Sequence, residues 1–321
     1  MIKAAGADIR QMKVIFFGSS NYSAEILRAL IDMGIRPVLV VTQPDRPKGR
    51  HLKKQPTVIK EFALKENLEV AAPVNLKDSS FSALIKKKQP DFYLIVSYGK
   101  ILPQALLSIP KIMPLSLHPS LLPEYRGPAP LNWVLINGEK KTGVCLFEVN
   151  KEMDAGRIIA QKEISIAYED DYLTLFDKVY SVSKELVIKH LPSIYSGKAG
   201  FKVQDEEKVT FAPKIDKKVS KVDWDNSAVN IRNLVRGLVP YPCAWSKFKD
   251  KRVKFWKVDI ENIDISSGGE GKVVSVEKGK VKVQAGKGLV VLKLIQPEGK
   301  RVMDIQEFIN GYNPQEGDIF K

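Results

Sequence analysis

The sequence predicts an α/β fold in which a doubly wound, mostly parallel sheet is followed by a small β-barrel. Two observations lead to this prediction. In the first half of the chain, short apolar strands alternate with segments of helical periodicity, which is typical of a parallel sheet with helices on both faces. In the last third, short strands alternate with glycine-rich turns, which is typical of a small barrel.

The first strand and helix form the first β-turn-α unit. Residues 14–17 are apolar and end at Gly18, after which apolar residues recur at helical spacing over 24–31. No Gly-x-Gly-x-x-Gly or Gly-Lys-Ser/Thr motif follows, so neither phosphate-binding fingerprint is present. Instead, Gly18 allows the strand to turn sharply.

The alternation of strands and helices continues along the chain. We expect strands at 37–42, 68–71, 91–96, 113–117 and 144–149, and helices at 57–66, 79–87, 103–107 and 170–191. Ligands of such sheets bind beyond the carboxyl ends of the strands. We therefore expect the functional site at that edge.

A length of 321 residues and a hydrophobic content of 44% are sufficient for one large core and a smaller one beside it. Polar residues from Ser196 to Lys208 mark a break between the two. We expect an N-terminal extension at 1–11, a catalytic domain at 12–195, a linker at 196–213 and a C-terminal domain at 214–321.

Several functional classes are disfavoured by the sequence. The longest apolar runs are far shorter than the roughly 20 residues that span a bilayer, and no secretory signal follows the first basic residues. Cys145 and Cys243 lie far apart and have no partner pattern, so we expect neither a disulfide framework nor a zinc site. We expect a cytoplasmic protein.

Positive charge is the main compositional bias of the chain. The 51 Lys+Arg and 37 Asp+Glu residues give a formal net charge of +14, which indicates a polyanionic partner. A soluble protein with a basic bias would have the same composition, so composition leaves both interpretations open. The positive charge is concentrated in a loop with Arg46, Lys48, Arg50, Lys53 and Lys54 and in a hairpin with Lys249, Lys251, Arg252 and Lys254.

The C-terminal part predicts a Greek-key barrel of the oligonucleotide-binding (OB) type. We expect a helix at 226–237 and strands at 244–248, 252–258, 271–277, 280–285 and 289–295. Adjacent strand residues point to opposite faces, so Phe255 and Trp256 should divide between the core and the surface. The basic face would then contact RNA backbone, or remain an ordinary solvated surface.

His118 is the first candidate for chemistry. It follows a short apolar strand and enters a loop bounded by Pro119, Pro123 and Gly127. Histidine titrates near neutrality, with an unperturbed pKa of ~6.5. A lone loop histidine is more often structural, but a second turn-bounded segment places Asp154 just before a glycine. An acid beside a histidine can hold its tautomer and keep it protonated, and both residues should emerge beyond strand carboxyl ends.

These segments resemble a known family. His118 to Pro123, Tyr125-Arg126-Gly127 and Met153 to Gly156 match, in sequence and spacing, the 10-formyltetrahydrofolate-dependent formyltransferases. The resemblance runs from about Met12 to the C-terminus. Further segments resemble the branch that formylates methionyl initiator tRNA, namely 43–50, 211–215, 223–224, 231–242 and 294–300.

The resemblance implies a Rossmann-like catalytic domain that transfers a formyl group from 10-formyltetrahydrofolate to the α-amino group of methionyl initiator tRNA, without a metal and as a monomer. It implies Ser116, His118 and Asp154 as catalytic residues and the loop from Arg46 to Lys54 as a tRNA contact, to which the cations of the hairpin from Lys249 to Lys254 would add. It also implies a folate pocket formed by Tyr98, Gly99, Ser120, Leu121, Leu122 and Pro123. Residues 97–100 are equally typical of a plain strand-to-helix turn.

One residue departs from the family pattern. The family has Asn-x-His, whereas this chain has Ser116-Leu117-His118. A hydroxyl can donate a hydrogen bond as the asparagine amide does, but from closer to the backbone. Two alternatives stay open. One is a formyltransferase or hydrolase with another acceptor, such as a nucleotide-sugar amine or water, and the other, suggested by this serine, is an RNA-binding homologue with impaired catalysis.

Overall fold

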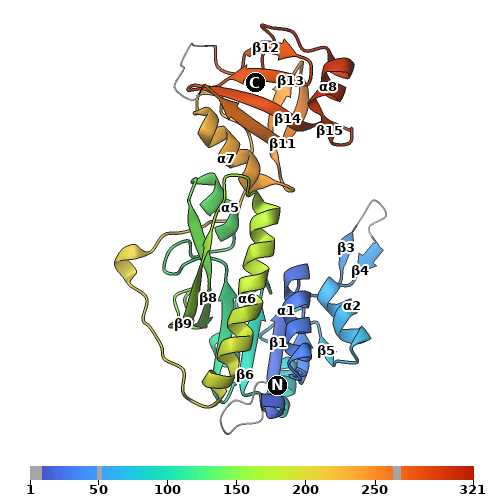
Figure 1. The fold of residues 1–321 in the computed structure, drawn as a ribbon. Helices are drawn as coiled ribbons and strands as arrows, with labels where there is room; N and C mark the ends of the chain where they lie inside the picture. The colour runs from blue at the N-terminus through green and yellow to red at the C-terminus, as the bar shows by residue number, and fades with distance from the viewer. Residues whose placement is uncertain (1–8, 49–52, 263–268) are drawn as a thin grey trace. The chain divides into compact units, whose positions relative to one another are not determined.

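The computed structural model describes residues 9–48, 53–262 and 269–321 (Figure 1). The chain divides into two compact units. The first unit comprises the chain up to Arg126, Gly143–Ile164 and Lys178–Phe211, and the second comprises Gly127–Thr142, Ser165–Asp177 and Ala212–Lys321. The domain boundaries expected from the sequence stay a prediction. No helix in the described parts of the chain has both the length and the apolar character needed to cross a membrane.

The main sheet has seven strands in the order β5-β2-β1-β6-β7-β8-β9. All pairings from β5 through β7 are parallel, and β8 is antiparallel to β7, so the predicted mostly parallel sheet is confirmed. The strands are β1 (Val14–Gly18), β2 (Leu39–Val41), β5 (Val70–Ala71), β6 (Phe92–Val96), β7 (Met113–His118), β8 (Lys141–Glu148) and β9 (Ile158–Ser165). The sequence analysis did not predict β9 because most of its residues are partly or fully exposed.

Helices cover both faces of this sheet. Ile15 and Phe17 of β1 pack in one core with Phe81 and Ile85 of α3. Phe16 alternates with them and points to the other face, where α1 and α6 lie (Figure 1). The helices of this part are α1 (Asn21–Asp32), α2 (Val58–Lys65), α3 (Ser79–Lys88), α4 (Gln104–Leu107) and α6 (Tyr172–Tyr195).

Gly18 and Ser20 determine the sharp turn from β1 into α1. Ser20 caps the helix by accepting a hydrogen bond from the backbone N–H of Ser23, and the Ser23 hydroxyl in turn accepts from the backbone N–H of Ser20. A Cβ atom at Gly18 would lie 2.5 Å from the Cβ of Ser23. Only glycine therefore lets the chain turn this closely at the carboxyl edge of the sheet.

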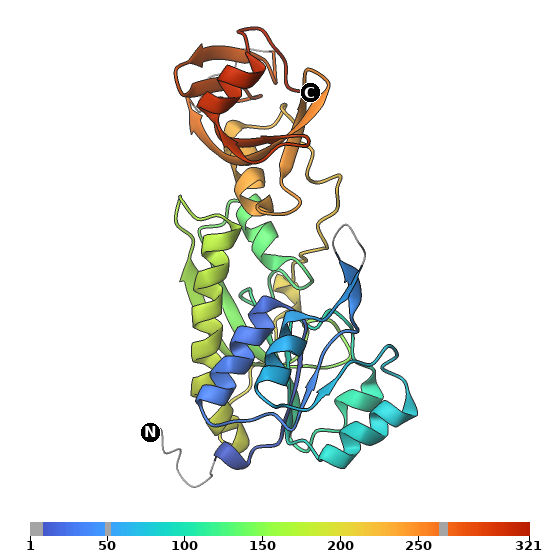
Figure 2. The same cartoon turned by 90° about the vertical axis from the view of Figure 1, so that its right-hand side faces the viewer.

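The C-terminal sheet is antiparallel throughout, with the order β10-β11-β14-β13-β12 and β15 paired to β14. Its strands are β10 (Ala244–Phe248), β11 (Lys251–Glu261), β12 (Val273–Glu277), β13 (Lys280–Gln284), β14 (Leu289–Pro297) and β15 (Met303–Asp304). The helices of the second unit are α5 (Pro130–Ile136), α7 (Ala228–Leu238) and α8 (Ile305–Tyr312), of which the sequence analysis predicted only α7 (Figure 2).

The last residues of the chain connect the two edge strands and so close the barrel. Lys321 exchanges two backbone hydrogen bonds with Lys247 of β10, at 2.7 and 2.8 Å. Val273 of β12 donates to the carbonyl oxygen of Asp318 at 2.7 Å and accepts from the N–H of Gly317 at 2.8 Å. Residues 317–321 therefore act as the final strand of the barrel.

Phe320 secures this closing segment in the core. Its side chain is 1% exposed, and its ring centroid lies 4.7 Å from that of Phe248, 5.8 Å from that of Phe255 and 5.9 Å from that of Trp224. The barrel core and the closure of its edges thus depend on the same residue.

We expect Phe320→Ala to lower the free energy of unfolding of the second unit by about 3–5 kcal/mol, because it removes a buried ring and leaves a cavity. Urea unfolding followed by tryptophan fluorescence measures this loss. Ile319→Ala is the matched control, since Ile319 is 48% exposed and should change stability little. Equal losses for the two variants would contradict the role given to Phe320.

Candidate active site

The structure brings His118 and Asp154 together. His118 is the last residue of β7 and is 5% exposed, and its Nδ1 lies 3.5 Å from Oδ2 of Asp154. Its Nε2 lies 2.8 Å from the backbone carbonyl oxygen of Tyr125. A carbonyl oxygen can only accept, so Nε2 carries a hydrogen and donates it. Both ring nitrogens therefore face oxygen acceptors, and the plane of the imidazole is fixed.

Asp154 reaches His118 by a different route from the one expected. We expected both residues to emerge at the same edge of the sheet, beyond the carboxyl ends of their strands. This expectation is wrong for Asp154, because β8 runs antiparallel to β7. His118 pairs with Cys145 and Leu115 with Glu148, so the carboxyl end of β8 lies beside the first half of β7. The loop after Glu148 must turn back to bring Asp154 to the imidazole.

Gly156 makes this return possible. A Cβ atom at Gly156 would lie 1.5 Å from the carbonyl oxygen of Glu148, a distance that no side chain can occupy. Asp154 itself has a φ of +55°, in the left-handed region that residues with a side chain rarely adopt. Such a conformation costs about 1–2 kcal/mol and persists only where neighbouring groups hold it.

A second left-handed residue lies on the other side of the imidazole. Tyr125, whose carbonyl oxygen accepts from His118, has a φ of +60°. Its N–H donates to Oγ1 of Thr210 at 2.8 Å. The carbonyl oxygen of Asp154 similarly accepts from Nε2 of Gln204 at 2.8 Å. The two backbone turns that flank His118 are thus held by residues of the segment expected to be a linker.

The sequence analysis assigned no role to Gln204, Thr210 or Arg126. Arg126 is 6% exposed and donates to Oε1 of Gln204 from Nε at 3.0 Å and from Nη2 at 2.8 Å. It also pairs with Glu206, and this hydrogen-bonded guanidinium lowers the pKa of the Glu206 carboxyl. The position of Arg126 inside the Tyr-Arg-Gly motif was the only sequence signal for this cluster.

Ser116 uses its hydroxyl within the sheet. Its Oγ donates to the backbone carbonyl oxygen of Ile95 on β6 at 2.9 Å, and the residue is half-buried. A serine hydroxyl has only one hydrogen, so it can reach another acceptor only by leaving Ile95. In the described structure the side chain anchors β7 to β6 two residues before His118.

Tyr98 and Gly99, which the sequence placed in a ligand pocket, follow β6 at the carboxyl edge. The Tyr98 side chain is 1% exposed, its hydroxyl has no hydrogen-bond partner within the described ranges, and burial raises its pKa to about 12. Its carbonyl oxygen accepts from Nε2 of Gln43 at 2.7 Å. Gly99 is exposed and has a φ of +76°. At this edge of the sheet a ligand could therefore contact the backbone of Gly99, whereas the Tyr98 hydroxyl is buried.

The loop from Ser120 to Pro123 is held in place by Cys145 of β8. Its Sγ donates to the carbonyl oxygen of Ser120 at 2.9 Å and accepts from the N–H of Leu122 at 3.2 Å. Burial raises the pKa of the Cys145 thiol to about 12, so it stays protonated and suits this structural role. The Ser120 hydroxyl is buried and donates to the carbonyl oxygen of Glu124, whereas Leu121 and Pro123 are partly exposed.

The first basic segment forms a hairpin that the sequence analysis did not predict. Strands β3 (Arg46–Lys48) and β4 (Lys53–Gln55) pair antiparallel, and Arg46 and Lys54 are exposed. Arg50 lies outside the described residues. The hairpin displays two of the predicted cations at the surface.

The second basic segment covers the end of β10 and the start of β11. Lys251 and Arg252 are exposed, and the Arg252 guanidinium lies 4.0 Å from the centre of the Trp245 ring. Lys254 is half-buried. Lys249 instead forms an ion pair with Asp318 at 3.1 Å, so its charge is paired within the fold.

The predicted division of Phe255 and Trp256 between the two faces is confirmed. Phe255 is 1% exposed and belongs to the barrel core. Trp256 is half-buried and donates from Nε1 to Oε1 of Gln296 at 3.1 Å. Within the described ranges of the chain, no group of three or more His, Cys, Asp or Glu side chains is arranged to hold a metal ion.

Comparison with known proteins gives a consistent result over most of the chain. Residues 12–191 match the model of the formyl transferase family, and residues 214–313 match that of the formyl transferase C-terminal domain. A methionyl-tRNA formyltransferase of Thermodesulfovibrio yellowstonii is 43% identical over 95% of this chain and 97% of its own. One from Enterococcus faecalis is 38% identical over 93% and 96%, respectively.

Solved structures with the same fold include two proteins that are more distant in sequence. The N-formyltransferase of Helicobacter canadensis, in complex with folinic acid and dTDP-3-aminofucose, is 17% identical with a TM-score of 0.68, over 88% of this chain and 99% of its own. HypX of Aquifex aeolicus, in complex with tetrahydrofolic acid, is 18% identical with a TM-score of 0.62, over 97% and 50%, respectively. Both likenesses concern the fold alone.

Proposed function

Because the chain belongs to the formyl transferase family, we propose that it transfers the formyl group of 10-formyltetrahydrofolate to the α-amino group of methionyl initiator tRNA. The observation that carries this proposal is the contact between His118 and Asp154 at the end of β7. The names of relatives that match nearly the whole chain support the choice of acceptor. We further propose that the enzyme acts as a cytoplasmic monomer.

The reaction requires charge stabilisation and proton movement rather than a covalent nucleophile. A free α-amine titrates at roughly 7.7–8, so an appreciable fraction is neutral and can attack at neutral pH. Its attack on the formyl carbon develops negative charge on the formyl oxygen. When this intermediate collapses, the bond between the formyl carbon and the folate nitrogen breaks, and the folate nitrogen takes up the proton that the amine loses. His118 donates a hydrogen bond to that oxygen, and Asp154 holds the imidazole in place.

The contacts of the imidazole indicate where the formyl oxygen binds. The Nε2–H is already donated at 2.8 Å to the carbonyl oxygen of Tyr125. The 3.5 Å separation between Nδ1 and Asp154 is longer than a normal N–H···O hydrogen bond. We therefore place the reacting oxygen on the Nδ1 side, where it enters without breaking the Tyr125 contact.

Two surfaces complete the proposed site. The folate lies against the edge formed by Gly99 and the loop of Leu121 and Pro123, with Tyr98, Ser120 and Leu122 shaping this edge from within. The tRNA backbone contacts the cations of the two basic segments, a form of charge that provides affinity without reading sequence. In this proposal Arg46, Lys48, Arg50, Lys53 and Lys54 act from one segment, and Lys251, Arg252 and Lys254 from the other. Lys249, which the sequence placed in the second set, is paired with Asp318 instead.

One assay separates this function from its alternatives. The protein is incubated with 10-formyltetrahydrofolate and with methionyl-tRNA, a nucleotide amino sugar or no acceptor, and both formylated product and free tetrahydrofolate are measured. Product on methionyl-tRNA supports the proposal. Product on the sugar, release of folate without an acceptor, or tRNA binding without turnover would each replace it with a different function.

We expect His118→Ala and Asp154→Ala each to lower the single-turnover rate of formyl transfer by about 10²–10³-fold, because each removes a group that stabilises the transition state. The affinity for tRNA should stay within a few fold, since neither residue belongs to the basic segments. Rapid-quench measurement with saturating substrates gives the rate. A near-normal rate in either variant would exclude that residue from the chemistry.

Replacing Lys251, Arg252 and Lys254 together by serine should weaken tRNA binding and flatten its salt dependence. Each lost phosphate contact lowers the slope of log affinity against log salt by roughly 0.7–0.9. Filter binding at several salt concentrations measures the slope. The control is a triple serine variant at Lys77, Lys86 and Lys87, which are exposed and lie outside both basic segments.

The charge of the control variant changes equally, so it reports the effect of net charge alone. Its slope should remain close to that of the unmodified protein. An equal change of slope in both variants would show that β11 makes no local contact with the tRNA.

For Ser116 we expect that asparagine raises the rate of the chemical step and that alanine lowers it by less than about tenfold. The serine hydroxyl is bonded to Ile95, whereas an asparagine amide carries two hydrogens and reaches further from the backbone. Single-turnover rates of the three forms test this. If the alanine variant equals the unmodified protein, Ser116 plays no part in binding the formyl oxygen. If both substitutions slow the step, the pocket is adapted to serine.

A further inference from the structure

Residues 202–211 form an ordered strap across the first unit rather than a free linker. At one end, Lys202 and Ile158 of β9 exchange two backbone hydrogen bonds, both of 2.8 Å. At the other end, the N–H of Arg126 donates to the carbonyl oxygen of Thr210 at 2.9 Å, and Arg126 forms a parallel bridge with Phe211. The strap is therefore attached on both sides of the His118 site.

We propose that Gln204, anchored by Arg126, is a positioning residue for formyl transfer: its side-chain amide fixes the backbone turn that presents Asp154 to His118. This proposal rests on the proposed function, because it assigns the two residues at the end of β7 to the chemistry. It adds a residue of the segment between the two family domains to the catalytic machinery.

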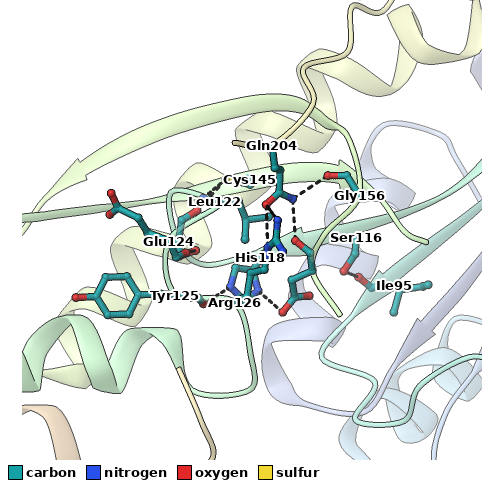
Figure 3. Close-up of polar contacts among 12 residues, drawn as sticks. Ile95, Ser116, His118, Leu122, Glu124, Tyr125, Arg126, Cys145, Gly156 and Gln204 are labelled. Carbon is teal, nitrogen blue, oxygen red and sulfur yellow. Dashed lines mark hydrogen bonds and ion pairs between the residues drawn. The ribbon is translucent and has the colours of Figure 1, made fainter. Parts of the chain in front are cut away.

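Both ends of the Gln204 side-chain amide are hydrogen-bonded, and Figure 3 shows its contacts with Arg126 and Gly156. The residue is 6% exposed, and its Nε2 donates to the carbonyl oxygens of Asp154 and Gly156, both at 2.8 Å. Its Oε1 accepts from Nε and Nη2 of Arg126. Carbonyl oxygens only accept and a guanidinium only donates, so these partners determine which end of the amide is nitrogen. The amide cannot rotate without losing all four bonds.

The backbone turn at Asp154 depends on these hydrogen bonds from Gln204. Asp154 has a φ of +55°, and the backbone of Gly156 packs directly against the carbonyl oxygen of Glu148 on its other side. Gln204 donates hydrogen bonds to the carbonyl oxygens of Asp154 and Gly156. These bonds stabilise a backbone conformation that would otherwise relax to a more common one. The carboxylate position relative to Nδ1 of His118 depends on this turn.

The strap holds the other neighbour of His118 as well. Thr210 accepts from the N–H of Tyr125, which has a φ of +60° and whose carbonyl oxygen accepts from Nε2 of His118. Arg126, the next residue, is fixed by Gln204 and by a two-pronged contact with Glu206 at 2.8 and 3.2 Å. Because Nε, Nη1 and Nη2 of Arg126 all donate to the strap, this arginine acts as an anchor and not as a cation for substrate.

The test compares Gln204→Glu and Gln204→Ala with the unmodified full-length protein. Glutamate keeps the acceptor for Arg126 but places an oxygen against two carbonyl oxygens, whereas alanine removes the amide without adding charge. We expect both variants to lower the single-turnover rate of methionyl-tRNA formylation by 10–100-fold. The KM values for tRNA and 10-formyltetrahydrofolate should stay within threefold. Glu207→Gln, an exposed neighbour on the strap, should change the rate by less than twofold.

A double-mutant cycle separates positioning from general structural damage. If Gln204 acts through Asp154, then Gln204→Glu should cause less than a twofold further loss in an Asp154→Ala background. A full rate in both Gln204 variants, or an equal loss with and without Asp154, overturns the proposal. Asp154→Ala measured alone tests the proposed function. A full rate of formyl transfer in that variant would exclude the pair of His118 and Asp154 from the chemistry. A loss of rate in that variant, together with a full rate in the Gln204 variants, would contradict only the positioning role of Gln204.

Discussion

The antiparallel pairing of β8 with β7 is the constraint on which the rest of the site depends. It sets Cys145 beside His118, where the thiol can hold the loop that follows, and it directs the end of β8 away from the imidazole. The chain must then turn back, and it can do so only because Gly156 has no side chain to collide with Glu148. The contact between Asp154 and His118 therefore depends on the direction of β8 as well as on the identity of the two residues.

Much of the fold could be predicted because its signals are local. Buried strands such as Val14–Gly18 and helices such as α7 have the apolar periodicity that burial demands. Two elements with few buried side chains were missed for the same reason. Most residues of β9 are partly or fully exposed, and the β3–β4 hairpin is built from arginine, proline, lysine and glutamine. Their pairing comes from backbone hydrogen bonds, which leave no hydrophobic pattern in the sequence.

The site was predictable in its residues but not in its geometry. The loop around His118 and the acid before Gly156 are recognisable from residue type and spacing. That the Ser116 hydroxyl bonds to Ile95, or that Tyr125 and Asp154 adopt left-handed conformations, depends on strands and loops far apart in sequence. Gln204 shows this limit most clearly, since a glutamine in a polar segment carries no sign of the two carbonyl oxygens that it binds.

The strap bears on how proteins of this kind are divided into modules. The two matched family domains cover residues 12–191 and 214–313, so residues 202–211 belong to neither. Yet these residues supply hydrogen bonds to both turns beside the imidazole. A catalytic module cut at the end of the first match would keep His118 and Asp154 but lose the groups that hold their backbones. Recombination between relatives, in evolution or in protein engineering, should therefore keep the intervening segment with the first domain.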